Sequence, residues 1–313
     1  MRFGIHNPSW LFGADPYRMF EELKRKARWA EQHGYTWFSV MDHLIQIPGV
    51  GQPEEPFMEG WTVLSALAAV TEKIRLATLA TSVAYRNPAL LAKMAAGVDI
   101  ISGGRLTFGF GAGWYYQEYG QYGYEFPERP AVRIRQMEEA LQLIKLMWTE
   151  PRATFYGRYF HSEEAILEPK PLQKPHPPVM VGGSGEQLTL RVLARHGDAC
   201  NLFGDPATVQ HKLEVLRRHC EAEKRDYNSI ERTNLTSLLL ARSETELQAK
   251  RDRLGIPAQF RGYALSVSQA LDLIGEYQRV GSQLFITSFV RNDWESMELL
   301  AGEIMPHFAV ESA

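Results

Sequence analysis

The chain has 313 residues, and 34 Lys and Arg against 37 Asp and Glu give it a formal charge of −3. With 45% hydrophobic and 23% charged residues, its composition is typical of globular proteins and excludes a disordered or fibrous chain. The charge is near neutral and no basic run occurs, which argues against nucleic acid or an anionic membrane surface as a partner. No apolar stretch approaches the roughly 20 residues that a membrane span needs.

Two further features of the sequence concern the compartment. Met1–Ser9 carries an Arg and no apolar segment, so we expect no signal peptide. Cys200 and Cys220 are too few for a disulfide framework or a zinc cluster, and they fit a reducing environment. We therefore expect a cytoplasmic protein.

Short apolar strands alternate with amphipathic helices along the chain. Each strand is followed by helical sequence, and three of the helices open on an Asp or Asn directly before a Pro, a strong N-terminal signal. The predicted strands are, in chain order, Phe3–His6, Tyr35–Met41, Ile74–Val83, Arg105–Gly111, Val179–Gly182, Ala199–Phe203, Asn234–Ala241 and Gln283–Phe289. The intervening helices are predicted at about Pro16–His33, Trp61–Thr71, Pro88–Gly103, Ile134–Trp148, before His196-Gly197, after Asp205-Pro206, after Ser243 and from Trp294.

Eight strand–helix units in about 300 residues predict a closed parallel (β/α)₈ TIM barrel, an α/β fold. An open doubly wound sheet is the alternative, but no glycine fingerprint follows the first strand. Two segments interrupt the alternation: Trp114–Val132 after strand 4, and Glu150–Pro178 before strand 5. Since no internal linker is evident, we expect one domain, residues 1–313, with these two insertions.

In such barrels the active site forms at the carboxyl ends of the strands. Asp42-His43, at the end of the second strand, pairs a carboxylate with the side chain that titrates nearest to neutral pH, which suits proton transfer. A purely structural loop pair is the alternative. The other strand ends supply His6, Ser82-Val83, Gly111–Trp114, Gly182–Gly185, Asn201 and Thr287-Ser288.

Glycines mark two of these strand ends. Thr107, Gly109, Gly111 and Gly113 share one face of the fourth strand, which indicates close approach either by a planar cofactor or by backbone. Gly182-Gly183-Ser184-Gly185 joins the fifth strand to a helix, where free backbone N–H groups bind phosphate; a plain turn is the alternative. No motif with the spacing of metal ligands occurs, so we expect no metal site.

Several stretches together resemble the luciferase-like flavin and deazaflavin oxidoreductases. They are FSVMDHL (38–44), TSVAYRNPALLAK (81–93), DIISGGRLTFGFGAGWYYQE (99–118), residues 133–148, EPKPLQKPHPP (168–178), VGGSGE (181–186) and HGDACN (196–201). The segment Asp42–Trp61, followed by Tyr85-Arg86-Asn87-Pro88, is most similar to the branch that uses coenzyme F420. The resemblance implies a (β/α)₈ barrel, hydride transfer at the deazaflavin C5, and a homodimer.

The resemblance also implies roles for individual residues. Asp42 matches a position that hydrogen-bonds the deazaflavin, and His43 matches the neighbouring acid/base, so both are our catalytic candidates. Ser82-Val83 matches a non-proline cis peptide that presses on the ring. Gly182–Gly185 match the phosphate-binding turn, and Gln117 matches a polar group near the cofactor.

One position departs from the family pattern. The branch that oxidises a sugar phosphate carries Glu directly after its Gly-x-Gly, where this chain has Trp114. This departure puts sugar-phosphate chemistry in doubt. It favours a more apolar substrate, or reduction of an unsaturated or carbonyl compound, while Glu118 remains available nearby. We expect His6, Trp114 and Glu118 to line the substrate pocket. Substrate and direction of transfer stay open.

Three other functions compete with an F420-dependent oxidoreductase. The first is an FMN-dependent two-component monooxygenase of the same superfamily, supplied with reduced cofactor by a separate reductase. The second is a metal-dependent barrel hydrolase, against which the lack of ligand spacing speaks. The third is a non-catalytic flavin-binding protein, against which the intact Asp42-His43 pair speaks mildly.

Overall fold

The computed structural model describes residues 1–10, 15–257 and 259–308. Eight parallel strands close into a barrel, because the first barrel strand pairs with both the second and the last. The barrel strands are β1 (Arg2–Asn7), β2 (Trp37–Val40), β3 (Arg75–Thr78), β5 (Leu106–Gly111), β8 (Val179–Gly182), β9 (Ala199–Leu202), β10 (Glu231–Ala241) and β12 (Leu284–Phe289). All eight lie at predicted strands. The closed barrel is confirmed, and the open doubly wound alternative is wrong.

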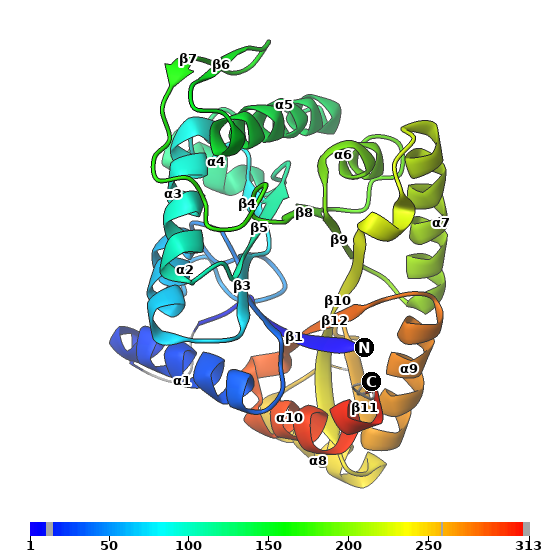
Figure 1. The fold of residues 1–313 in the computed structure, drawn as a ribbon. Coiled ribbons are helices and arrows are strands. Elements are labelled where there is room, and N and C mark those ends of the chain that lie inside the picture. The colour runs from blue at the N-terminus through cyan, green and yellow to red at the C-terminus, as the bar shows by residue number, and fades with distance from the viewer. Residues whose placement is uncertain (11–14, 258, 309–313) are drawn as a thin grey trace.

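Helices surround this barrel (Figure 1). They are α1 (Met19–Gln32), α2 (Gly60–Val70), α3 (Pro88–Ile101), α4 (Tyr116–Tyr122), α5 (Pro130–Thr149), α6 (Thr189–His196), α7 (Pro206–Ala222), α8 (Glu244–Leu254), α9 (Val267–Arg279) and α10 (Trp294–Leu299). The expected caps are present: the Asn87 side chain accepts from the N–H groups of Ala89 and Leu90, and Asp205 accepts from that of Thr208. No helix in the described part of the chain is long and apolar enough to cross a membrane.

The two faces of each barrel strand have different surroundings. On β5, Leu106, Phe108 and Phe110 pack outward in the large cluster shared with the helices. Side chains on the inner face form a second, smaller cluster inside the barrel, which includes Trp37, Leu79, Met180, Ala199 and Ile286. The alternation predicted for the fourth strand is therefore the division between the helix layer and the barrel interior.

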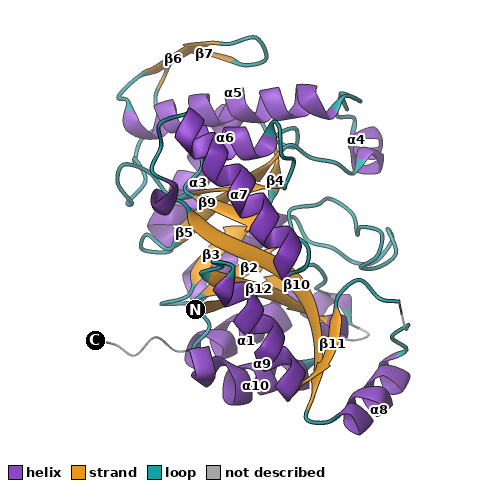
Figure 2. Ribbon diagram, turned by 90° about the vertical axis from the view of Figure 1, so that its right-hand side faces the viewer, coloured by secondary structure: helices purple, strands orange, loops and turns teal. Residues whose placement is uncertain are grey.

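The insertions contain short elements that the sequence did not predict. The first insertion holds α4, and the second holds the antiparallel pair β6 (Ala153–Tyr156) and β7 (His161–Ala165), which extends beyond α5 at one end of the molecule (Figure 2). Between α8 and α9, β11 (Tyr263–Ser266) adds a parallel strand beside β10; Ala258 lies outside the described residues.

The third predicted strand, Ile74–Val83, is not continuous. It divides into β3 and β4 (Thr81–Ser82), and both segments pair with β5. The two segments are held together by a hydrogen bond between the hydroxyls of Thr78 and Thr81, 2.8 Å apart. The apolar pattern runs through this interruption unchanged, and for that reason the sequence suggested one strand.

Candidate active site

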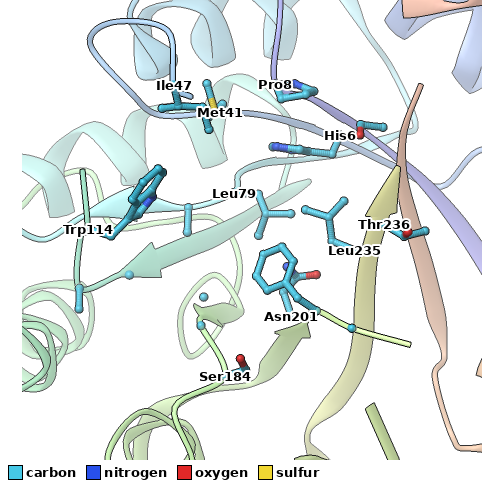
Figure 3. Close-up of a pocket in the computed structure, with 18 of the residues that line it drawn as sticks. His6, Pro8, Met41, Ile47, Leu79, Trp114, Ser184, Asn201, Leu235 and Thr236 are labelled. Atoms are coloured by element: carbon cyan, nitrogen blue, oxygen red, sulfur yellow. The ribbon is translucent and has the colours of Figure 1, made fainter. Parts of the chain in front are cut away.

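A cavity of about 1170 Å³ opens at the carboxyl ends of the barrel strands. It exceeds the roughly 300–1,000 Å³ of ordinary ligand pockets, so it has room for a cofactor ring and a substrate together. Several strand-end candidates from the sequence line this cavity. They are His6, His43, Gly111, Trp114, Gly182–Gly185, Asn201 and Ser288. In Figure 3, His6 of β1, Asn201 of β9 and Leu79 of the interruption after β3 reach into the cavity, with Trp114 and Ser184 at its edges.

Backbone of the interruption between β3 and β4 forms one side of the cavity. The non-proline cis peptide lies at Leu79-Ala80, and both residues line the cavity. The expected position, Ser82-Val83, is therefore wrong by three residues. In the structure Ser82 bonds its hydroxyl to that of Tyr119 at 2.8 Å, and Val83 is buried in the outer core. The error follows from treating Ile74–Val83 as one strand, which placed its end too late.

Two of the glycines make room for this backbone. A Cβ on Gly109 would lie 1.8 Å from the carbonyl oxygen of Thr78, and one on Gly182 would lie 3.0 Å from the Cβ of Ala80. At Gly111 the nearest atom would be 3.7 Å away, an ordinary contact. Close approach by backbone therefore explains Gly109, whereas Gly111 leaves open surface on the cavity wall.

His43 lies on the cavity wall and is held from behind by Glu118. Its Nδ1 is 2.6 Å from Glu118 Oε2, and the carboxylate is fully buried. The same oxygen accepts from the hydroxyl of Tyr85. The other oxygen accepts from the backbone N–H groups of Leu44 and Ile45 at 2.5 and 3.2 Å. Glu118 does not itself line the cavity in the described part of the chain; it joins α4 to the segment after β2.

These contacts determine the charge of Glu118. Burial acts to raise the pKa of this carboxyl, but the hydrogen bonds from His43, Tyr85 and Leu44 outweigh it and hold the pKa below the usual value. Burial and the neighbouring carboxylate raise the pKa of Tyr85, so the phenol stays protonated and donates. The cluster thus contains an ionised carboxylate surrounded by donors at neutral pH.

Asp42 is buried and pairs with Arg86. Its two carboxylate oxygens accept from Arg86 at 2.8 and 2.9 Å, and Arg86 also pairs with Glu59. Burial raises the pKa of Asp42 although Arg86 acts in the opposite direction. Among the residues that the structure describes, Asp42 is not part of the cavity wall. Its expected contact with a deazaflavin stays a prediction.

Two buried polar side chains, from different strands, also line the cavity. His6 Nδ1 lies 3.0 Å from the hydroxyl of Ser39, and burial lowers the pKa of His6 to about 3, so its ring is neutral at physiological pH. Asn201 is fully buried, and its Oδ1 lies 3.1 Å from the hydroxyl of Thr233. Its Nδ2 has no hydrogen-bond partner among the described residues. A buried amide group without a partner on a cavity wall indicates a ligand that completes its hydrogen bonds.

The remaining predicted site residues do not all line the cavity. Gly182–Gly185 line the cavity, with Gly183 at a φ of +107°, although α6 begins only at Thr189 after an intervening turn. Trp114 lies at the rim, 54% exposed, with its ring edge-on to His43. Gln117 accepts from the Tyr115 hydroxyl at 2.9 Å and is not part of the wall in the described residues. Its contact with a cofactor, like those of Ser82 and Val83, stays a prediction.

Sequence reasoning missed four residues of this site. Leu79 and Ala80 were assigned to the interior of a strand, and Tyr85 was quoted only as part of a motif. Arg133, in the first turn of α5, lines the cavity while its guanidinium donates to the carbonyls of Gly113 and Glu128. Its position directly after the aromatic insertion was the one available signal. In the described ranges, no three His, Cys, Asp or Glu side chains gather as a metal site would require.

A family model described as luciferase-like monooxygenase matches residues 1–297 of the chain. The chain belongs to the luciferase-like monooxygenase family. An uncharacterized protein of Mycobacterium tuberculosis is 33% identical over 213 residues, which cover 64% of this chain and 74% of that protein. The pyrimidine monooxygenase RutA of Allorhizobium ampelinum is 33% identical over 201 residues, 62% of this chain and 53% of RutA.

Solved structures confirm the luciferase-like fold. An F420-dependent secondary alcohol dehydrogenase superimposes with a TM-score of 0.82 at 20% identity, covering 99% of both chains. The EDTA monooxygenase of Chelativorans sp. BNC1 superimposes with a TM-score of 0.81 at 18% identity, covering 98% of this chain and 93% of that one. This fold thus occurs in an F420-dependent dehydrogenase and in a monooxygenase. The family match supports an oxidoreductase that acts on a small molecule with a cofactor of the flavin or deazaflavin type.

Proposed function

We propose that the protein is an F420-dependent oxidoreductase that transfers a hydride between the deazaflavin C5 and a small organic substrate. The observation that carries this proposal is His43 on the cavity wall, backed by the ionised carboxylate of Glu118. Reduction of a carbonyl, or oxidation of an alcohol, needs a proton donor or acceptor beside the hydride path. An imidazole so placed can serve as that acid or base.

The residues of the cavity fit a cofactor of the flavin type. The backbone at Gly182–Gly185 is open to a phosphate group, and the unpartnered amide of Asn201 offers a hydrogen bond to a polar ring edge. Leu79 and Ala80 present an apolar surface on which a planar ring can lie. When bound, the cofactor supplies the hydride chemistry; the chain binds it, orients it and exchanges the proton through His43.

We assign Asp42 a supporting role in this function. Because both of its oxygens are bound by Arg86, Asp42 fixes the backbone directly before His43. Trp114 and His6 remain our candidates for contact with the substrate, since both line the cavity. Glu118 acts on the substrate only through His43.

An FMN-dependent monooxygenase is the second candidate. The names of two curated relatives favour it, the pyrimidine monooxygenase RutA and an FMNH2-dependent dimethylsulfone monooxygenase of Pseudomonas putida, the latter 31% identical over 161 residues. In this alternative a separate reductase supplies the reduced cofactor. Homodimer formation is expected under either candidate by analogy with the family.

Titration of the purified protein with F420 and, separately, with FMN tests the choice of cofactor. Trp114 lies on the cavity wall, so a ring bound there is expected to quench tryptophan fluorescence. We expect F420 to bind at least about tenfold more tightly than FMN, a difference of about 1.4 kcal/mol. Tighter binding of FMN would put the monooxygenase first. Failure of both cofactors to bind would contradict both candidates.

A further inference from the structure

The carboxylate of Glu118 has a hydrogen-bond donor at every available side. It receives the Tyr85 hydroxyl, the His43 ring and the backbone N–H groups of Leu44 and Ile45. An ionised carboxylate has no proton to give, so each of its partners must be the donor. The two backbone groups can only donate. The imidazole of His43 must therefore also donate, through Nδ1.

We infer that Glu118 is a positioning residue that fixes the tautomer of His43, with the proton on Nδ1 and with Nε2 presented to the cavity. The inference rests on the proposed function only in taking His43 as the acid/base; the tautomer itself follows from the contacts. In the neutral ring Nε2 then carries a lone pair and acts as a base. In the imidazolium form the same Nε2 carries the proton to be donated.

The surroundings of the ring restrict it to this orientation. His43 meets Trp114, Tyr115 and Tyr85 edge-on, at ring-centroid distances of 5.8, 6.3 and 6.5 Å. These aromatic walls oppose a flip of the ring that would turn Nε2 toward the carboxylate. Tyr85 contributes a second donor to the same oxygen and so fixes the carboxylate itself. The Nε2 atom has no partner among the described residues.

This arrangement gives the first insertion a function. Glu118 lies on α4, 75 residues after His43, and it contacts the segment after β2, as does the Tyr122 hydroxyl, which donates to the carbonyl of Leu44. Trp114 directly follows Gly111-Ala112-Gly113, at the position where the resemblance implies an acid for the sugar-phosphate branch. An acid is present four positions later, but it faces the imidazole instead of the cavity. Positioning of the base through a buried carboxylate is therefore built into this chain by the insertion.

The tautomer can be measured on the free protein by NMR with ¹⁵N-labelled histidine, without cofactor or substrate. At a pH where His43 is neutral, we expect a protonated Nδ1 and an unprotonated Nε2. In Glu118→Gln an amide N–H₂ group can face the ring, so we expect Nδ1 to become the acceptor and the proton to move to Nε2. A His43→Asn spectrum identifies which of the nine histidine signals belongs to His43.

Tyr85→Phe is the matched control, because it removes one donor from Glu118 but keeps the carboxylate, and we expect the wild-type tautomer in it. Should Glu118→Gln fail to fold, the wild-type and Tyr85→Phe spectra still show which ring nitrogen of His43 carries the proton. A proton on Nε2 in the wild type, or an unchanged tautomer in folded Glu118→Gln, would overturn the inference. Turnover of Glu118→Gln should fall about 10²–10⁴-fold with cofactor affinity little changed. The spectra are independent of the cofactor titration, so the inference and the proposed function can fail separately.

Discussion

Replacing His43 by Ala should lower turnover by about 10²–10⁴-fold, the usual contribution of a positioned general acid or base. The substitution removes a titratable side chain that lies on the cavity wall and is held from behind by a buried carboxylate. Cofactor affinity should change little, because Gly182–Gly185, Asn201 and the Leu79-Ala80 backbone remain in place. Glu118 keeps three of its four donors, so we expect the variant to fold.

This result is measured by steady-state kinetics with reduced F420 and a substrate obtained by screening carbonyl and unsaturated compounds. His161→Ala is the matched control, since His161 is an exposed histidine on the β6–β7 hairpin. Its turnover should equal that of the wild type. If His43→Ala also retained full turnover, His43 would not be the acid/base, and the observation that carries the proposed function would be lost.

Replacing Gly109 by Ala should destabilise the fold by about 3 kcal/mol or more. The added Cβ would lie 1.8 Å from the backbone carbonyl oxygen of Thr78, far inside van der Waals contact, and backbone cannot turn aside as a flexible side chain can. Overpacking of a tight core costs 1–3 kcal/mol, roughly, even where side chains can adjust. The displaced backbone includes Leu79 and Ala80, so cofactor binding should weaken as well.

Gly111→Ala provides the comparison, because Gly111 lies two residues along the same strand and its Cβ would meet nothing closer than 3.7 Å. We expect its stability to stay within about 0.5 kcal/mol of the wild type. Chemical denaturation of both variants measures the difference. Equal stability of Gly109→Ala and Gly111→Ala would contradict the close approach of the two backbone segments at this point.

The sequence predicts those features that depend on neighbouring residues. The hydrophobic periods of strands and helices are local, and the caps at Asn87 and Asp205 use N–H groups within three residues. The eight barrel strands could therefore be located, and the closed barrel followed from their number. The rule that active sites lie at the carboxyl ends of barrel strands then selected His6, His43 and Gly182–Gly185, which do line the cavity.

Features that depend on long-range contacts could not be read in the same way. The interruption at Leu79-Ala80 arises where β3 and β4 both pair with β5, and the apolar pattern of residues 74–83 does not record it. The pairing of Asp42 with Arg86 joins residues 44 positions apart, and that of His43 with Glu118 joins residues 75 apart. No local pattern specifies such partners, so Glu118 was expected on the pocket wall and lies behind His43 instead.

A crystal structure of the protein with F420 bound would test the central claim most directly. We predict that the deazaflavin ring lies against Leu79 and Ala80, with its phosphate at Gly183–Gly185 and His43 Nε2 facing the reacting side of the ring. A ring bound outside this cavity, or one bound so that His43 faces away from it, would contradict the account.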